Sequence, residues 1–332
     1  MIKRLISMKK LIYFLSTILT LVITSCNDEW TDELYENYVS FKAPLNDLGL
    51  TNVYVKYQSG GKSTYNLPVI VSGTNANESE ITAQVALDPD TLASLNYDRF
   101  QNRKEFYYTL MADSLYSIPD MTVKIPARAR EGLLPINFNF HNIDMFYKWV
   151  LPLTIVSGPG CTPHPRKNYK KAILRVIPFT DFSGTYQSTN MNVYLKGSTK
   201  NPFAVNTRQA YVVNDSTIFF YAGSITDDDV NRYVYKIYVT FNPDNTLTVT
   251  AANSGINFKL NSPATYSVDS HMDEKVPYLM FKYVQLNLDY SFDDITSLPG
   301  TAIGYEARGN MTMVRRINTL IPDEEQAVDW GE

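Results

Sequence analysis

The sequence predicts an all-β protein built from two tandem domains. Most segments after Tyr38 alternate apolar and polar residues with a period of two, which is typical of half-buried antiparallel strands. Short runs of Gly, Pro, Asn and Asp separate these segments, and only one stretch has a helical pattern. A chain of 332 residues is long enough to bury two cores of ordinary domain size.

The first domain is expected over residues 38–178. Val53, Val55 and Tyr57 alternate with polar residues, and so fall on one face of a strand. The strands expected by the same reasoning are 51–58, 80–87, 121–126, 135–140 and 148–156. One helix is expected over 88–96, because Asp88 can cap it and Pro89 suits its first turn. These elements predict a β-sandwich with one short helix joining two strands.

The second domain is expected over residues 179–322, followed by a tail over 323–332. Its predicted strands are long, and several are rich in tyrosine on one face. They are expected at 190–196, 208–213, 217–222, 233–242, 246–251, 278–292 and 303–317. Long meandering antiparallel strands favour an up-and-down barrel or a curved sheet over a second sandwich.

An export signal is expected over residues 1–25. Lys9 and Lys10 precede a short apolar run that ends at Cys26, and Met8 is an alternative start. The run is too short to span a bilayer as a mature helix. The ending Ile-Thr-Ser-Cys26 resembles a bacterial lipobox, which implies cleavage before Cys26, attachment of palmitate-like acyl chains and a membrane anchor. An ordinary signal peptide with a chance cysteine is the alternative.

Residues 26–37 form an expected acidic tether. Asp28 and Glu29 follow the cysteine closely, an arrangement similar to the surface-export signal of Bacteroidota lipoproteins. That similarity implies display on the outer face of the outer membrane. A solvated acidic tether without a sorting role would have the same composition.

Charge and composition exclude several classes of partner. Removing residues 1–25 removes four basic residues and no acidic ones, so the formal charge changes from −4 to −4 − 4 = −8. Such a chain has no electrostatic basis for binding nucleic acid. The three histidines are far apart, so no metal site and no cofactor are expected. Calcium binding by the loop carboxylates at Asp227–Asp229 stays open, although these residues lack the spacing of a calcium-binding loop.

The sequence favours a non-enzymatic protein. Glycoside hydrolysis needs two carboxylates at a fixed separation. The acidic clusters, which include Asp269 and Asp273, fall in predicted polar loops. There is also no alternation of strands and helices from which a TIM barrel could be built.

Parts of the first domain resemble a domain of unknown function that is common in exported Bacteroidota proteins. The matching pieces are Asn37–Phe41, Leu67–Gly73, Leu87–Asp90, Asn96–Tyr97, Tyr116–Pro119 and Val150–Leu153. The resemblance implies an immunoglobulin-like sandwich in a polysaccharide-utilisation locus. The Phe-Ser-Gly-Thr-Tyr186 segment likewise resembles the first strand of lipocalin-like barrels. The implied partners are an oligosaccharide or polysaccharide and a TonB-dependent transporter complex.

Aromatic residues beside predicted loops are the candidate ligand-binding residues, because a flat ring can stack on a sugar. They are Tyr186, Tyr194, Tyr221, Tyr266, Tyr305 and Trp330. We therefore expect the second domain to hold most of the ligand and the first to act as a spacer. An adhesive or structural module that contacts a partner protein is the first alternative function, and an unfamiliar glycoside hydrolase is the second.

Overall fold

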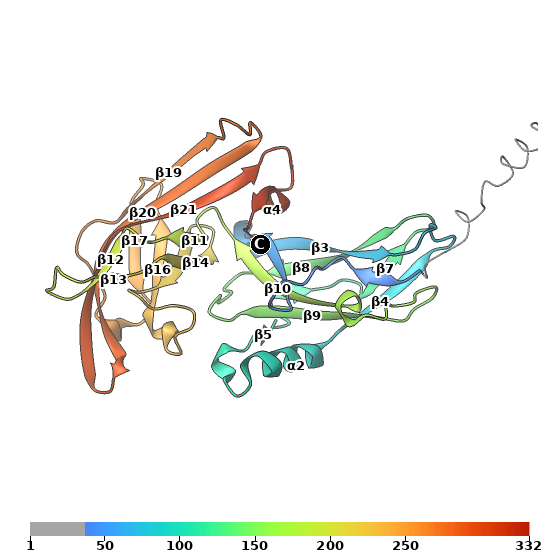
Figure 1. Ribbon diagram of the computed structural model, residues 1–332, viewed down its shortest axis with the longest axis horizontal. Coiled ribbons are helices and arrows are strands. Elements are labelled where there is room, and N and C mark those ends of the chain that lie inside the picture. Colours follow the sequence, from blue (N-terminus) through green and yellow to red (C-terminus); the bar gives the residue numbers. More distant parts are fainter. Residues whose placement is uncertain (1–36, 332) are drawn as a thin grey trace, which may run out of the picture.

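Two β-rich units follow one another in the computed structural model of the chain, which describes residues 37–331 (Figure 1). The prediction of an all-β protein is confirmed. Cys26, Asp28 and Glu29 lie outside the described residues, as do the predicted signal peptide and most of the tether. Among residues 37–331, no helix has the length and apolar character needed to cross a membrane.

The N-terminal unit is a sandwich of two sheets. The smaller sheet has the order β1 (Val39–Phe41), β3 (Lys62–Val71), β8 (Glu131–Asn139) and β6 (Tyr116–Ser117). The larger sheet has the order β2 (Thr51–Lys56), β10 (Lys171–Phe179), β9 (Trp149–Val156), β4 (Ile81–Leu87) and β7 (Thr122–Ile125). A short strand, β5 (Thr109–Leu110), pairs with the start of β9. Three short helical turns complete the unit: η2 (Ser59–Gly61), η3 (Lys104–Phe106) and α3 (Lys167–Lys170).

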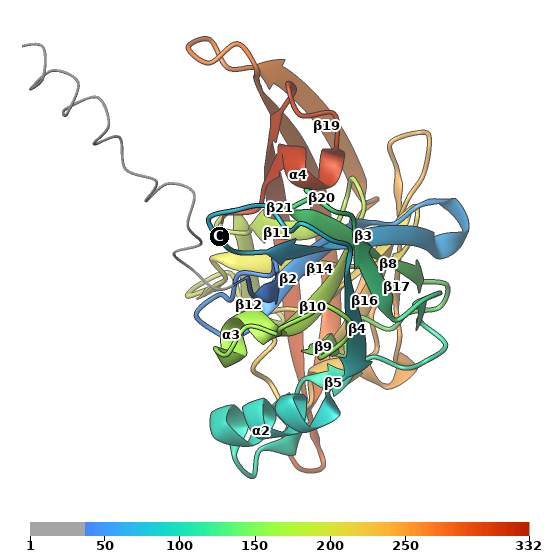
Figure 2. The ribbon, with the colours of Figure 1, turned by 90° about the vertical axis from the view of Figure 1, so that its right-hand side faces the viewer.

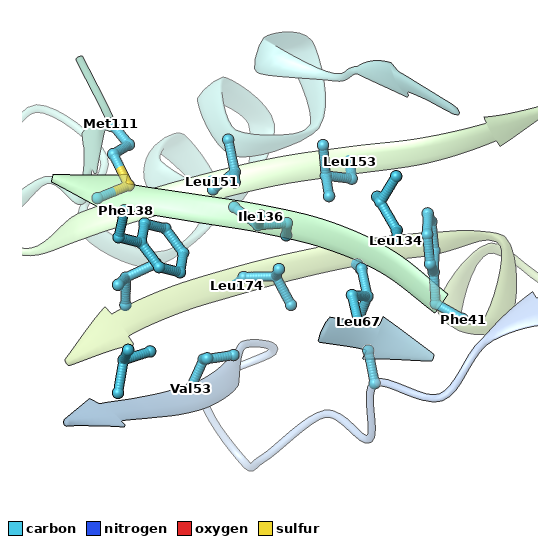
Figure 3. Close-up of a cluster of buried hydrophobic side chains, with 14 of the residues drawn as sticks. Phe41, Val53, Leu67, Met111, Leu134, Ile136, Phe138, Leu151, Leu153 and Leu174 are labelled. Atoms are coloured by element: carbon cyan, nitrogen blue, oxygen red, sulfur yellow. The ribbon is translucent and has the colours of Figure 1, made fainter. Parts of the chain in front are cut away.

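The core of the sandwich lies between its sheets. In β2, Val53 and Val55 are buried while their neighbours are partly exposed, which is the alternation that the sequence shows. Figure 3 shows the apolar side chains of β8 and β9 filling the space between the two layers. The labelled members from these strands are Leu134, Ile136, Phe138, Leu151 and Leu153.

The one long helix, α2 (Pro89–Phe100), lies on the outside of the larger sheet beside β5 and β9 (Figures 1 and 2). The Asp88 carboxylate caps it by accepting hydrogen bonds from the Thr91 amide and hydroxyl. Leu92 packs in a small cluster with Val150 and Ile173. The helix continues beyond the predicted end at Asn96 to Phe100, whose side chain packs against the same cluster.

The C-terminal unit is one strongly curved sheet. Its strands have the order β13 (Phe203–Ala204), β12 (Met191–Leu195), β21 (Thr301–Asn318), β11 (Gly184–Gln187), β14 (Thr207–Asn214), β15 (Thr217–Tyr221), β16 (Lys236–Phe241) and β17 (Leu247–Ala251). The long β20 (Leu279–Leu298) pairs with β21 and also with β18 (Lys259–Leu260) and β19 (Thr265–Met272). The turn η5 (Ser254–Ile256) follows β17.

The sheet curls until β17 meets β19. Thr246 and Thr265 form an isolated bridge, and the Leu247 amide donates to the Ala264 carbonyl at 2.9 Å. Apolar side chains from all sides of the curve share one core, which includes Tyr186, Phe220 and Tyr290. The predicted antiparallel barrel or curved sheet is confirmed as a curled, barrel-like sheet, and the unit is not a second sandwich.

Two predicted elements differ from the observed ones. The segment predicted as a strand from Tyr233 begins with the turn η4 (Arg232–Tyr235), because the buried Tyr235 side chain is hydrogen-bonded to β20. Asp269, expected in a loop, lies in β19. Nearly all side chains of β19 are exposed, and although Tyr266, Val268 and Met272 alternate with polar residues, Ser270 interrupts the apolar positions.

The two units share an apolar interface. Phe219 and Tyr221, on β15, are buried in the same cluster as the core of the sandwich. The C-terminal tail also lies at the junction, where Figure 1 marks the end of the chain. It forms α4 (Glu324–Ala327) and β22 (Val328–Asp329), and Glu325 accepts a hydrogen bond from the Lys56 amide of β2 at 2.8 Å.

Candidate functional site

A cleft between the two units has a volume of about 870 Å³. Residues of η3 and of the loop before β9 line its N-terminal side. Residues of η4, the start of β16 and the loop after β17 line its C-terminal side. The size is within the range of roughly 300–1,000 Å³ that is usual for sites that bind small molecules.

Aromatic rings from both domains gather in this cleft. Phe146 is half-buried, and its ring centroid lies 5.3 Å from that of Tyr147 and 6.0 Å from that of Tyr233. Tyr147 belongs to the N-terminal domain and is 45% exposed, whereas Tyr233 belongs to the C-terminal domain and is 57% exposed. Tyr107 and Tyr238 also line the cleft. Exposed rings on two sides of an open cleft can stack on the faces of a flat, amphipathic ligand.

The N-terminal side of the cleft is held by Asp144. Its carboxylate accepts a hydrogen bond from the Phe146 amide at 2.9 Å, and its carbonyl accepts one from the Trp149 indole at the same distance. The carboxylate also forms an ion pair with Lys236 of the other domain, with an N–O distance of 2.7 Å. These bonds fix the loop that carries Tyr147 and join it to the barrel.

The C-terminal side is held by the buried Tyr235. Its hydroxyl donates to the Asp294 carboxylate at 2.6 Å and accepts from the amides of Ile295 and Thr296 at 3.1 Å. This network anchors η4 to β20, so that Tyr233 is left on the cleft side. The Arg232 guanidinium lies 4.6 Å from the Phe146 centroid, which adds a cation–π contact across the cleft.

This anchor predicts a loss of stability in acid. Burial by itself would raise the pKa of the Asp294 carboxyl, but hydrogen bonds from Ser297, Tyr235 and Thr296 outweigh it and lower that pKa from 3.8 to about 2. Because the folded pKa is depressed, the stabilisation is complete above about pH 4 and is lost as the pH falls toward 2. We expect a loss of about 1 kcal/mol after solvent screening. Denaturant unfolding of the wild type and of Asp294→Asn should show it, and an equal acid dependence in both proteins would contradict it.

Two of the tyrosines predicted to bind ligand are buried. Tyr186 is fully buried inside the barrel, where its hydroxyl donates to the Phe182 carbonyl at 2.7 Å. Tyr221 is 4% exposed and lies in the interface between the domains. Neither ring has a free face for a sugar, so the structure corrects both assignments. Tyr186 alternates with more exposed neighbours in β11, whereas β15 is buried on both faces, so Tyr221 is packed on either side of the sheet.

Three other predicted tyrosines are half-buried and do not come together. Tyr266 donates to the Asn242 carbonyl at 2.9 Å and packs on aromatic neighbours. Tyr194 lies opposite Glu306 in the pairing of β12 with β21, one position from Tyr305. Because successive residues of a strand point to opposite faces, Tyr194 and Tyr305 lie on different sides of the sheet. None of the three lines the large cleft.

Trp330 packs against the N-terminal domain. Its ring stacks on Tyr54 with a centroid distance of 3.9 Å and an angle of 2°, and it meets the edge of Phe179 at 4.7 Å. The indole nitrogen donates to the Glu325 carbonyl at 3.1 Å. Trp330 borders two other cavities, of about 340 and 720 Å³, but one face of its ring is already occupied by Tyr54. The structure therefore assigns Trp330 to domain contact rather than to sugar stacking.

Trp330→Ala should accordingly destabilise the protein. Loss of a half-buried stacked tryptophan is expected to lower the free energy of unfolding by about 2–3 kcal/mol. Chemical denaturation measures this change, and Trp330→Phe should retain part of the stability. A Trp330→Ala protein that unfolds like the wild type but loses ligand would restore the original assignment.

The cleft residues escaped the sequence analysis for a clear reason. Tyr147 and Tyr233 lie far apart in the sequence, and only the docking of the two domains brings them together. The local signal that could have revealed the first is the dense aromatic run Phe146-Tyr-Lys-Trp149, which directly follows a turn. Within residues 37–331, no group of three His, Cys, Asp or Glu side chains is placed to hold a metal ion.

Comparisons with known proteins match both domains. Residues 30–159 match a family model described as a domain of unknown function, DUF4973. Residues 170–312 match a second model, which describes a C-terminal domain. No curated protein matches the chain.

Three solved Bacteroides structures are similar over most of the chain. A Bacteroides ovatus multidomain protein that includes DUF1735 is 42% identical, and the match covers 88% of this chain and 100% of that one with a TM-score of 0.80. A second Bacteroides ovatus protein, of unknown function, is 44% identical with coverages of 88% and 100% and a TM-score of 0.81. A Bacteroides thetaiotaomicron protein described as an auxiliary nutrient binding protein is 39% identical, with coverages of 89% and 100% and a TM-score of 0.79.

Proposed function

Because this chain belongs to a family of two-domain Bacteroides proteins with a DUF4973 domain, we propose that it is a carbohydrate-binding protein whose site is the interdomain cleft. One observation carries this proposal. Two exposed tyrosines, Tyr147 and Tyr233, approach the same half-buried phenylalanine from different domains. An apolar ring face with a hydroxyl at its edge complements a sugar, which has apolar C–H faces and polar edges.

A relative supports the proposal. The Bacteroides thetaiotaomicron protein, similar over its whole length, is described as an auxiliary nutrient binding protein. We propose the same class of role here, in which the protein captures an oligosaccharide and passes it to an outer-membrane transporter. Because both domains line the cleft, the proposed site uses the N-terminal sandwich directly.

We propose binding without catalysis. The two carboxylates that line the cleft are each in an ion pair, Asp144 with Lys236 at 2.7 Å and Glu105 with Arg103 at 3.5 Å. A glycosidase needs one carboxyl that keeps its proton and a second that acts as base or nucleophile. Both carboxylates that line this cleft are instead engaged by basic side chains.

The proposed location is the outer face of the outer membrane, held by acyl chains on Cys26. Asp28→Ala with Glu29→Ala should leave the lipid anchor intact and move the protein to the periplasmic face. The reason is that a sorting signal acts as an address, while the acyl chains supply the anchoring energy. Protease accessibility on whole cells measures the change, and unchanged accessibility would show that the acidic residues form only a tether.

A glycan screen tests the binding proposal. The full chain, purified in detergent, should bind at least one polysaccharide or oligosaccharide in affinity gels or on a glycan array. Alanine substitution of the cleft tyrosines should abolish that signal. A chain that binds no member of a broad plant, fungal and host panel would contradict the proposed function.

A further inference from the structure

The large cleft carries an excess of basic side chains although the whole chain is acidic. Lys104, Lys148, Arg232 and Lys236 line it, against Glu105 and Asp144. Lys236 is paired with Asp144, and Glu105 is paired with Arg103 outside the lining. Among residues 37–331, the other three basic side chains of the cleft form no ion pair within 4.0 Å.

Arg232 is the most buried of these cations, at 3% exposure. Its guanidinium lies 4.6 Å from the Phe146 centroid and 5.8 Å from that of Phe106, and one terminal nitrogen donates to the Asp229 carbonyl at 3.0 Å. The Nε–H is buried and has no hydrogen-bond partner among the described residues. A buried donor without an acceptor is unfavourable, so a ligand oxygen that reached it would recover a charge-assisted hydrogen bond.

Lys148 is the second cation without a paired carboxylate. Burial lowers the pKa of its ammonium group; Arg175 and Arg232 act in the same direction, and Asp227 and Asp228 oppose it. Lys148 lines the cleft without an ion pair within 4.0 Å among the described residues, so an anionic ligand group could reach its half-buried ammonium and favour the charged form.

The cations and the exposed rings are adjacent in the chain. Lys148 directly follows Tyr147, and Arg232 directly precedes Tyr233. Each side of the cleft therefore presents one stacking ring together with one cation. We infer that the cleft selects an acidic saccharide, whose carboxylate or sulfate group lies between Lys148 and Arg232 while its rings stack on the tyrosines. This inference rests on the proposed function and names the class of saccharide.

Matched pairs of saccharides test the inference on the full chain in detergent. One pair is tetragalacturonic acid and its methyl ester, in which methyl groups remove the charge of the carboxylates. The other pair is a chondroitin sulfate tetrasaccharide and its desulfated form, which keeps the carboxylates. Calorimetric titration should show that at least one acidic member binds about tenfold or more tightly than its less charged counterpart. Loss on esterification would identify a carboxylate, and loss on desulfation would identify a sulfate.

Substitutions of cleft residues test whether the preference for acidic saccharides arises in the cleft. Lys148→Gln should weaken binding of the acidic member about tenfold and leave its neutral counterpart unchanged. Arg232→Lys keeps the charge but removes the planar donor set, and should weaken only the acidic member. Lys167→Gln removes the same charge from exposed α3, and should bind like the wild type.

The outcomes separate the two proposals. Equal affinity for charged and neutral members, or an equal loss of both in Lys148→Gln, would overturn the acidic preference. Binding of neutral glycans alone would overturn it too, while the cleft would remain a carbohydrate site. Absence of binding to charged and neutral glycans alike would overturn both proposals.

Discussion

Alanine at both Tyr147 and Tyr233 is expected to weaken saccharide binding about hundredfold. Each ring is about half exposed and lies on a different side of the cleft, so each can stack on one face of the ligand. A stacked aromatic contributes about 1–1.5 kcal/mol, and two contribute about 3 kcal/mol, which corresponds to a factor of about one hundred. Both rings contact Phe146, so the single variants need not add in a simple way.

The same double variant should fold normally, because exposed rings contribute little to the core. Thermal unfolding should therefore change little while calorimetric titration loses its signal. Tyr97→Ala is a matched control, since Tyr97 is 62% exposed on α2 and lines no part of the cleft. An unchanged affinity in the double variant, or an equal loss in Tyr97→Ala, would place the ligand elsewhere.

Cys26→Ala is expected to release the protein from the membrane completely. The proposed acyl chains supply the anchoring energy, at about 0.8 kcal/mol for each buried methylene. Membrane fractionation and palmitate labelling of cells measure the change. Cys161→Ala is the matched control, because Cys161 is a buried free cysteine of the N-terminal sandwich and should not be acylated. Palmitate that persists in Cys26→Ala would overturn the lipobox interpretation.

Much of the fold follows from alternation in the sequence. β2 and β4 were predictable because one face of each strand is buried and the other is not. Apolar and polar residues therefore alternate along each strand. β19 was missed although Tyr266, Val268 and Met272 alternate with polar residues, because the strand is exposed on both faces and its acidic and polar residues are typical of a loop. The barrel itself depends on the bridge between Thr246 and Thr265, a long-range contact that no local pattern specifies.

The site was harder to predict than the fold. Residue type alone cannot distinguish Tyr186, which is buried in the barrel, from Tyr233, which is exposed in a turn. Exposure of Tyr233 depends on η4, and η4 depends on the hydrogen bonds between Tyr235 and Asp294. Likewise, Trp330 in a polar tail suggested a ligand contact, but stacking on Tyr54 ties the tail to the other domain.

A crystal structure of the protein with its bound oligosaccharide tests the central claim most directly. The account predicts a sugar ring in the interdomain cleft, with the rings of Tyr147 and Tyr233 against its faces and the Asp144–Lys236 ion pair intact. A sugar bound instead beside Tyr194 or Tyr305 on the barrel, with the cleft empty, would contradict it.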